Sequence, residues 1–386
     1  MKTRLSAWKY VKNNKRAVAV LVTALALSFM AIYVIHVLLQ TTVESFKPIT
    51  LEIPKKLSYA NLSDKAYGIN REDYDTYEDY DAAVGERRGE LMESMKRRQG
   101  IDNVTYVQIL KCLYQAVVGQ LSYEVPLLSP GEIQGFLNHV DAKLVEGRMP
   151  GGDGEVLVDS AVMKNAGWEI GDWFMKDWYG ETFRIVGAIR SKYLVSVGTP
   201  MGHTNSGIYL VVYNDETATD LRSILKEEGI KLSEEDVVVD AAKGRELFEK
   251  DVEDVIGTVV SVISLIVTIF LVILVMVSYV SFMRNRVNEY CLYASIGYGR
   301  GEIYGMILRE TLLTFAMGSA IGLLASLGAG AVLTKLVIES KGLVGKLIYG
   351  DRILSIFGIY VFIIGMLQIP ILACISRIKT IDAIED

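Results

Sequence analysis

Four long apolar segments dominate the hydropathy pattern of the chain. They cover residues 17–39, 256–283, 311–334 and 353–375, and no Asp, Glu, Lys or Arg interrupts any of them. A helix needs about 20 apolar residues to cross the hydrocarbon core of a bilayer, so the pattern predicts four transmembrane helices. The first segment is longer than the apolar region of a signal peptide and ends without small cleavage-site residues, so we expect it to be retained.

The segment between the first two spans, residues 41–254, has a different pattern. Short β-like runs at residues 104–110, 154–162, 172–178, 181–189, 207–213 and 236–242 alternate with turn residues, and residues 215–228 and 244–254 favour helices. A stalk-like stretch at 41–57 and a charged run at 64–99 precede them. Tyr74, Tyr77 and Tyr80 recur in that run, which predicts a solvated helical face or, alternatively, a ligand-contacting face. The predicted fold is therefore four transmembrane α-helices with a large α+β extracytoplasmic domain between helices 1 and 2.

Charge sets the expected orientation. Residues 1–16 contain six basic residues, among them Lys2 and Arg4, and no acid; Arg377 and Lys379 follow the last span. Residues 41–254 carry a net charge of −14, whereas the whole chain carries −6, so the rest of the chain is net basic. Lys and Arg residues close to the ends of transmembrane helices are enriched on the cytoplasmic side. We therefore expect a multi-pass protein of the bacterial plasma membrane with both termini cytoplasmic. Residues 1–16, 284–310 and 376–386 are then cytoplasmic, and residues 335–352 form a short external loop; no nucleic-acid partner is expected.

Other candidate chemistry is sparse. The three His and three Cys residues show no metal-ligand spacing, so no metal site is predicted. Gly-Gly-Asp-Gly at 151–154 precedes a strand and is not followed by Lys-Ser/Thr, so a turn is favoured over a phosphate-binding loop. Gly318 and Gly322 form a small-xxx-small face on the third span, which predicts close helix packing within one protomer or across a dimer. Pro370 is expected to kink the fourth span.

Several stretches resemble one membrane-protein family. Residues 144–174, 183–189 and 208–215, then the loop at 284–313 and the end of the chain at 370–386, follow the order found in FtsX-like, MacB-type permeases of ABC transporters. The resemblance implies a MacB-like periplasmic core domain outside and an ATPase-coupling loop inside. It assigns the coupling to residues of that loop, namely Arg284, Arg286, Glu289, Tyr293, Gly297 and Glu302. A helix that only anchors the bundle at the membrane surface is the alternative.

The chain contains no Gly-x-x-x-x-Gly-Lys-Ser/Thr motif, so we expect no ATPase and no cofactor in it. ATP and Mg would bind a separate P-loop ABC ATPase subunit, and a second permease chain would complete a homodimer or paralogous heterodimer. The resemblance implies a permease whose outside domain exports or extracts a peptide or lipid-linked cargo. Two alternatives remain open: an FtsX-like regulator of a cell-wall hydrolase, and an ATP-independent membrane-anchored receptor.

Overall fold

The computed structural model describes residues 7–202, 207–215, 220–346 and 348–376, which divide into two compact units. One unit comprises residues 1–40, 258–335 and 346–386, and the other comprises residues 41–257 and 336–345. Lys2, Arg4, Arg377 and Lys379, on which part of the predicted orientation depends, lie outside the described residues.

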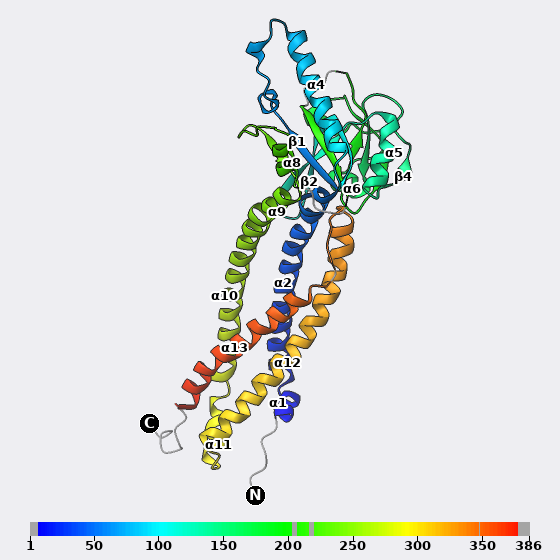
Figure 1. The fold of residues 1–386 in the computed structure, drawn as a ribbon. Coiled ribbons are helices and arrows are strands. Elements are labelled where there is room, and N and C mark those ends of the chain that lie inside the picture. The colour runs from blue at the N-terminus through cyan, green and yellow to red at the C-terminus, as the bar shows by residue number, and fades with distance from the viewer. Residues whose placement is uncertain (1–6, 203–206, 216–219, 347, 377–386) are drawn as a thin grey trace. The chain divides into compact units, whose positions relative to one another are not determined.

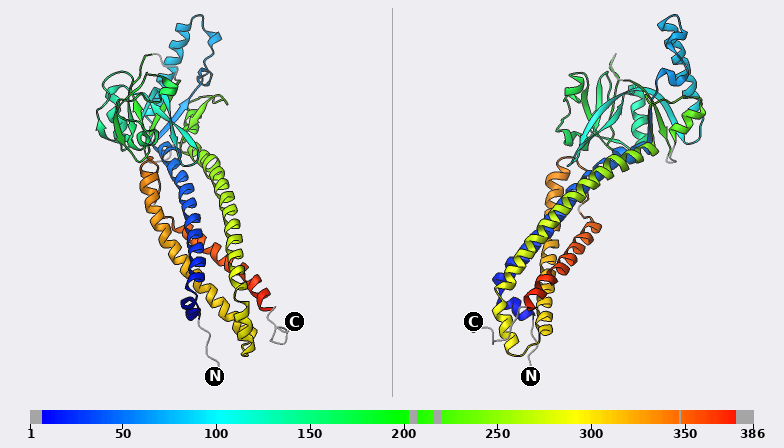
Figure 2. Two further views of the ribbon diagram at one scale, coloured as in Figure 1. Left: turned by 180° about the vertical axis from the view of Figure 1, so that it is seen from behind. Right: turned by 90° about the vertical axis from the view of Figure 1, so that its left-hand side faces the viewer.

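The first unit is helical (Figures 1 and 2). Its elements are α1 (Ala7–Asn13), α2 (Lys15–Lys47), α10 (Val255–Arg284), α11 (Val287–Ser295), α12 (Arg300–Leu333) and α13 (Gly350–Ser376). Four helical stretches of the described chain are long and apolar enough to cross a membrane. With the α+β domain described below, they confirm the predicted fold class.

The helices extend beyond the predicted spans. After α2, the π-helical turn η1 (Pro48–Glu52) and α3 (Ile53–Lys56) continue directly, so the predicted stalk is helical. On the return, α9 (Ala241–Leu247) and the π-helical η4 (Phe248–Asp254) lead into α10 without a break. α12 begins at Arg300, so the last residues of the expected coupling segment 284–310 are already helical. Hydropathy marks where a helix becomes polar, and a polar helix can continue past that point.

Two sheets form the second unit. The larger sheet has the order β3-β2-β8-β1-β9, formed by β1 (Leu57–Asn61), β2 (Ile101–Gln115), β3 (Gln120–Pro126), β8 (Ile208–Asn214) and β9 (Val237–Val239). The smaller sheet has the order β4-β6-β5-β7, formed by β4 (Lys143–Gly147), β5 (Glu155–Asp159), β6 (Arg184–Arg190) and β7 (Val197–Gly198). Only β5 and β6 pair in parallel in these ladders.

Alternation along the central strands creates two cores. Leu210 and Val212 of β8 join one cluster with residues of α4 (Tyr77–Lys96) and α8 (Leu221–Glu227). Val211 and Tyr213 point to the opposite face, where α5 (Pro130–His139) and the smaller sheet pack. The larger sheet is therefore buried on both faces, which accounts for the apolar run of β8.

Some sequence predictions for the domain are wrong. Residues 172–178 do not form a strand: Met175 has a left-handed backbone (φ 45°), and α7 (Lys176–Tyr179) follows it. Within the charged run, the long helix starts only at Tyr77, where Thr76 Oγ1 accepts a hydrogen bond from the Asp79 N–H (3.1 Å). Tyr74 therefore precedes the helix, although its ring still contacts that of Tyr80. The helix expected at 215–228 is shorter, Leu221–Glu227, and residues 216–219 lie outside the described chain.

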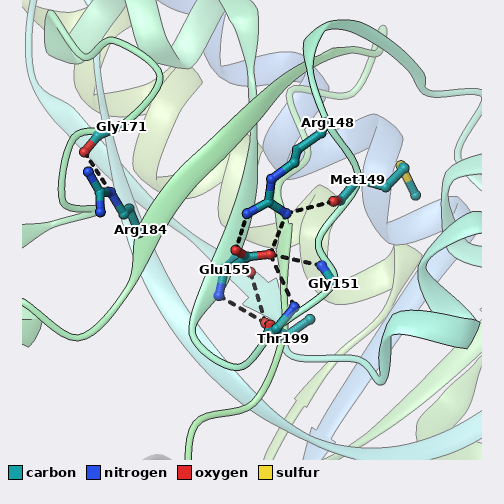
Figure 3. Close-up of polar contacts among 8 residues, drawn as sticks. Arg148, Met149, Gly151, Glu155, Gly171, Arg184 and Thr199 are labelled. Atoms are coloured by element: carbon teal, nitrogen blue, oxygen red, sulfur yellow. Dashed lines mark hydrogen bonds and ion pairs between the residues drawn. The ribbon is translucent and has the colours of Figure 1, made fainter.

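The glycine-rich segment before β5 forms a turn, as predicted (Figure 3). Arg148 makes a two-pronged contact with the Glu155 carboxylate, and the N–H groups of Gly151 (2.8 Å) and Gly152 (3.2 Å) donate to Glu155 Oε2. These contacts, with Arg148 first, lower the pKa of Glu155 to about 2. The backbone donors that an external phosphate would need are thus occupied by the chain's own carboxylate.

The segment between α12 and α13 belongs to the domain unit. The hydroxyl of the fully buried Tyr114 donates to the Gly342 carbonyl (2.7 Å), and Asn165 Nδ2 donates to the Lys341 carbonyl (3.0 Å). Gly342 has φ +59°, and a Cβ there would lie 1.9 Å from the Ala161 carbonyl oxygen. The contact therefore requires glycine at this position.

Candidate coupling site

A short helix connects α10 to α12 in the membrane unit. α11 follows α10 after two turn residues and ends at Ser295. Gly297 has φ +94°, its N–H donates to the Ala294 carbonyl (3.0 Å), and the Tyr298 N–H donates to the Tyr293 carbonyl (3.1 Å). This pair of bonds is a Schellman motif, which ends a helix with a left-handed residue. α12 then starts with the Gly299 N–H donating to Glu302 Oε2 (2.8 Å).

One face of α11 is fixed by a buried charge cluster. Arg286, 5% exposed, donates through Nη1 to Glu310 Oε2 (2.6 Å) and through Nε to Glu289 Oε2 (3.0 Å). Its guanidinium also lies over the rings of Phe282 (5.6 Å) and Tyr290 (5.0 Å). Glu310 is 4% exposed, so the Arg286–Glu310 pair is removed from water. Breaking such a pair is costly because the remaining charge stays buried, and the pair therefore fixes α11 against α12.

A second face of α11 presents an exposed stripe, whose first residue, Glu289, also accepts from Arg286. Glu289, Leu292, Tyr293 and Ile296 follow the i, i+3, i+4, i+7 spacing of one helical face. Leu292 is 58% exposed and Ile296 is 62% exposed, and the Tyr293 ring touches that of Tyr298. Two exposed aliphatic side chains beside a carboxylate and a phenol form a contact surface suited to another protein.

The predicted coupling residues divide between these two faces. Glu289 and Tyr293 lie on the exposed stripe, and Arg284 is exposed at the end of α10. Arg286, Gly297 and Glu302 instead hold the turns that orient α11. Leu292 and Ile296 were not among the predicted coupling residues, although their helical spacing from Glu289 places them on the same face. The partnership of Arg286 with Glu310, 24 residues away, had no signal in the sequence.

The two packing glycines contact the first helix of the same chain. A Cβ at Gly318 would lie 2.7 Å from Leu25 Cβ, and one at Gly322 would lie 2.6 Å from Phe29 Cβ. Of the two arrangements left open, this face makes its contact within one protomer. Pro370 lies inside α13 near its end.

One family model matches part of the membrane unit. Residues 261–383 match the family model described as FtsX-like permease C-terminal. The chain carries an FtsX-like permease domain. The predicted resemblance is thereby confirmed at the level of the family, whose members are permeases of ABC-type transporters. No curated protein matches the chain.

Solved structures resemble this chain only distantly. The periplasmic region of MacB from Actinobacillus actinomycetemcomitans is 12% identical with a TM-score of 0.28, over 53% of this chain and 96% of that one. The extracellular domain of the noncanonic ABC-type transporter YknZ from Gram-positive bacteria is 13% identical with a TM-score of 0.26, over 48% and 99%. At these scores the likeness does not by itself establish a shared fold.

Proposed function

We propose that the chain is the permease subunit of an ABC-type transporter and that the exposed stripe of α11 binds a separate ATPase subunit. The observation that supports it is the combination of Leu292 and Ile296, both exposed, with the buried Arg286–Glu310 pair at the start of the same helix. A contact surface on a helix that is clamped to a membrane helix can transmit force, whereas a loosely held helix would yield. ATP and Mg would bind the partner.

The proposed orientation places both termini, and α11 with them, in the cytoplasm of the cell membrane. A single cysteine at Asp153 in a cysteine-free chain should react with a membrane-impermeant thiol reagent on whole cells, and one at Asn285 should not. Labelling at Asn285 alone would reverse the orientation and remove α11 from the reach of ATP.

A second permease chain, identical or paralogous, is part of the proposal. α10 supports this, because it contains the most apolar of the four candidate spans but only 6% of its apolar stretch is buried. The apolar stretch of the first span is 50% buried. α10 therefore leaves most of its apolar surface for lipid or for another chain.

The proposed cargo is a peptide or lipid-linked molecule handled at the outer side by the domain. The described candidate spans bury few charged side chains, the Arg286–Glu310 pair lying at one end, which favours motion of the domain over passage of a polar cargo through the helices.

The deciding experiment changes the exposed stripe of α11 and leaves the buried Arg286–Glu310 pair intact. Full-length chain with Leu292→Ser and Ile296→Ser should insert and melt like the wild type, but lose copurification with the ATPase and permease-dependent ATP hydrolysis. The double variant Glu289→Ala with Tyr293→Ala should show the same loss.

The control is Glu78→Ala with Asp79→Ala, on the exposed start of α4, which should keep both properties. Equal ATPase binding by the stripe variants and the wild type would exclude α11 as the contact. A wild-type chain that binds no ATPase would favour the receptor alternative, and one that activates a cell-wall hydrolase without moving cargo would favour the regulator.

A further inference from the structure

An aromatic cleft on the domain unit is separate from the proposed coupling surface. Its volume is about 400 Å³, within the range of about 300–1,000 Å³ typical of small-molecule sites. Three of the four tryptophans of the chain, Trp168, Trp173 and Trp178, line it. The end of the β2–β3 hairpin contributes Gln115 and Gln120, which pair directly across the ladder.

The cleft is built on a fixed aromatic base. Phe174 is fully buried, contacts the Trp168 ring (5.4 Å) and stacks on Tyr179 (6.4 Å, 4°). The Tyr179 hydroxyl accepts from the Lys111 N–H (2.8 Å) and so ties this segment to β2. Trp168 is therefore held against a fixed base before any ligand arrives, which lowers the entropic cost of binding.

A strained residue positions the most exposed ring. Met175 has the left-handed φ of 45°, which is rare for a side chain of this size. Its carbonyl accepts a hydrogen bond from the backbone N–H of Trp178 (2.8 Å). Trp178 is consequently 50% exposed at the cleft. Strained backbone of this kind is found most often where a ligand is held.

The polar groups of the cleft restrict the chemistry of the ligand. In the described residues, the indole N–H groups of the three tryptophans and the side-chain amides of Gln115 and Gln120 have no hydrogen-bond partner within the chain. The carboxylate of Asp177 also lines the cleft, whereas Lys176 is paired with Glu181 (2.7 Å). Indole donates only, carboxylate accepts only, and amides do both. Such a set suits a neutral ligand with many hydroxyl groups better than a cation or an anion.

We propose that this cleft binds a saccharide. A pyranose ring offers flat C–H faces that pack on indole rings and a rim of hydroxyl groups that the amides, indole N–H groups and Asp177 can satisfy. The floor residue Asn165 acts as a support, because its amide already bonds the Gln115 backbone and the Lys341 carbonyl. The site goes beyond the proposed transport function, since it would bind sugar with or without an ATPase.

Intrinsic fluorescence tests the proposal, because Trp8 is the only tryptophan away from the cleft. The full-length Trp8→Phe chain is placed in phosphatidylcholine nanodiscs, free of glycosidic detergent, and titrated with maltose, cellobiose and N,N′-diacetylchitobiose. At least one sugar should change the emission saturably at millimolar concentration. Trp178→Ala or Gln115→Ala should weaken that binding about tenfold, about 1.4 kcal/mol. Both variants should melt like the parent, because the two side chains are exposed.

Two further measurements ask whether the sugar is free or lipid-linked and whether the cleft binds another class of ligand. Nanodiscs doped with a monoglucosyl diacylglycerol reveal whether the sugar arrives as a lipid headgroup or free in solution, and a Trp178-dependent response in either arm supports the site. A response to choline in place of sugars would indicate a cation-binding aromatic cage and overturn the proposal. A saturable response to no sugar in either arm would overturn it as well, leaving the tryptophans as contacts to the membrane surface.

Discussion

Replacing Gly322 by alanine tests whether α12 packs on α2 through its small-residue face. The added Cβ would lie 2.6 Å from Phe29 Cβ and 3.1 Å from the Ala26 carbonyl oxygen, whereas ordinary van der Waals contact begins at 3.4 Å. Phe29 cannot give way easily, because it is fully buried and its ring packs on Phe357 (5.4 Å) and Tyr360 (5.5 Å). The helices must therefore separate by about 0.8 Å.

Two effects of the substitution oppose each other. Overpacking of this kind costs about 1–3 kcal/mol, while alanine in place of glycine stabilises a helix by up to about 1 kcal/mol. Gly328 supplies the matched control on the same helix, because a Cβ there would meet nothing within 4 Å. The helix-propensity gain is common to both variants, so their difference isolates the clash. We expect Gly322→Ala to be less stable than Gly328→Ala by about 2 kcal/mol.

The assay is reversible unfolding of the full-length protein in mixed micelles with a rising fraction of dodecyl sulfate. Gly322→Leu should enlarge the loss, because a longer side chain must enter the same contact. Equal unfolding free energies for Gly322→Ala and Gly328→Ala would refute the packing argument. A larger loss at Gly328 would instead show that the other face of α12 contacts a second chain.

Three further predictions concern single contacts. Glu310→Gln should destabilise the protein by about 3–5 kcal/mol because it removes the buried carboxylate that pairs with the Arg286 guanidinium. Glu289→Gln, on the 47%-exposed second carboxylate, should cost less than about 1 kcal/mol; denaturation in mixed micelles measures both. The pKa of Glu155 is lowered to about 2, so its stabilisation is complete above the unfolded pKa of about 4.3 and is lost as the pH falls toward 2; the stability advantage of the wild type over Glu155→Gln should shrink over that range, and a constant advantage would contradict the assignment. Gly342→Ala should raise amide hydrogen exchange in residues 336–345, while Gly180→Ala, with a similar φ of +64° but nothing within 4 Å, should leave it unchanged.

The membrane helices were predictable because a bilayer imposes both a length and a composition on each span. The ends of the helices were not, since α2 runs past Glu44 and Lys47 into the domain sequence as a continuous helix. β4 was missed as a strand for another reason: all five of its residues are exposed, so it shows no alternation of apolar and polar positions. The strand expected at residues 172–178 failed because its aromatic residues favour β structure by propensity, while packing of Phe174 into the core imposes a turn.

At the candidate coupling site, too, local sequence indicates the helix, whereas tertiary contacts decide which of its faces is exposed. Helical spacing alone indicates α11 and its end at Gly297, because a period and a helix stop are local properties of sequence. Which face of α11 is buried depends on Arg286 meeting Glu310 after the chain has reversed direction, and no local pattern encodes that meeting. Helical spacing within residues 287–295 therefore indicates a helix but not which of its faces is exposed.

The segment 336–345 changes how force from the helices would reach the domain. Because this segment belongs to the domain unit, the chain passes between the two units four times. A domain inserted only between the first two spans would be connected by two passages. α12 leads into this segment through the π-helical turn η5 (Thr334–Glu339), and Tyr114 and Asn165 hold the backbone of Gly342 and Lys341. α12 also carries Glu310, the partner of Arg286 at the candidate coupling site. One continuous helix thus runs from the residue that clamps α11 to the segment that the domain holds, so a displacement of α11 has a covalent route to the domain that does not depend on α2 or α10.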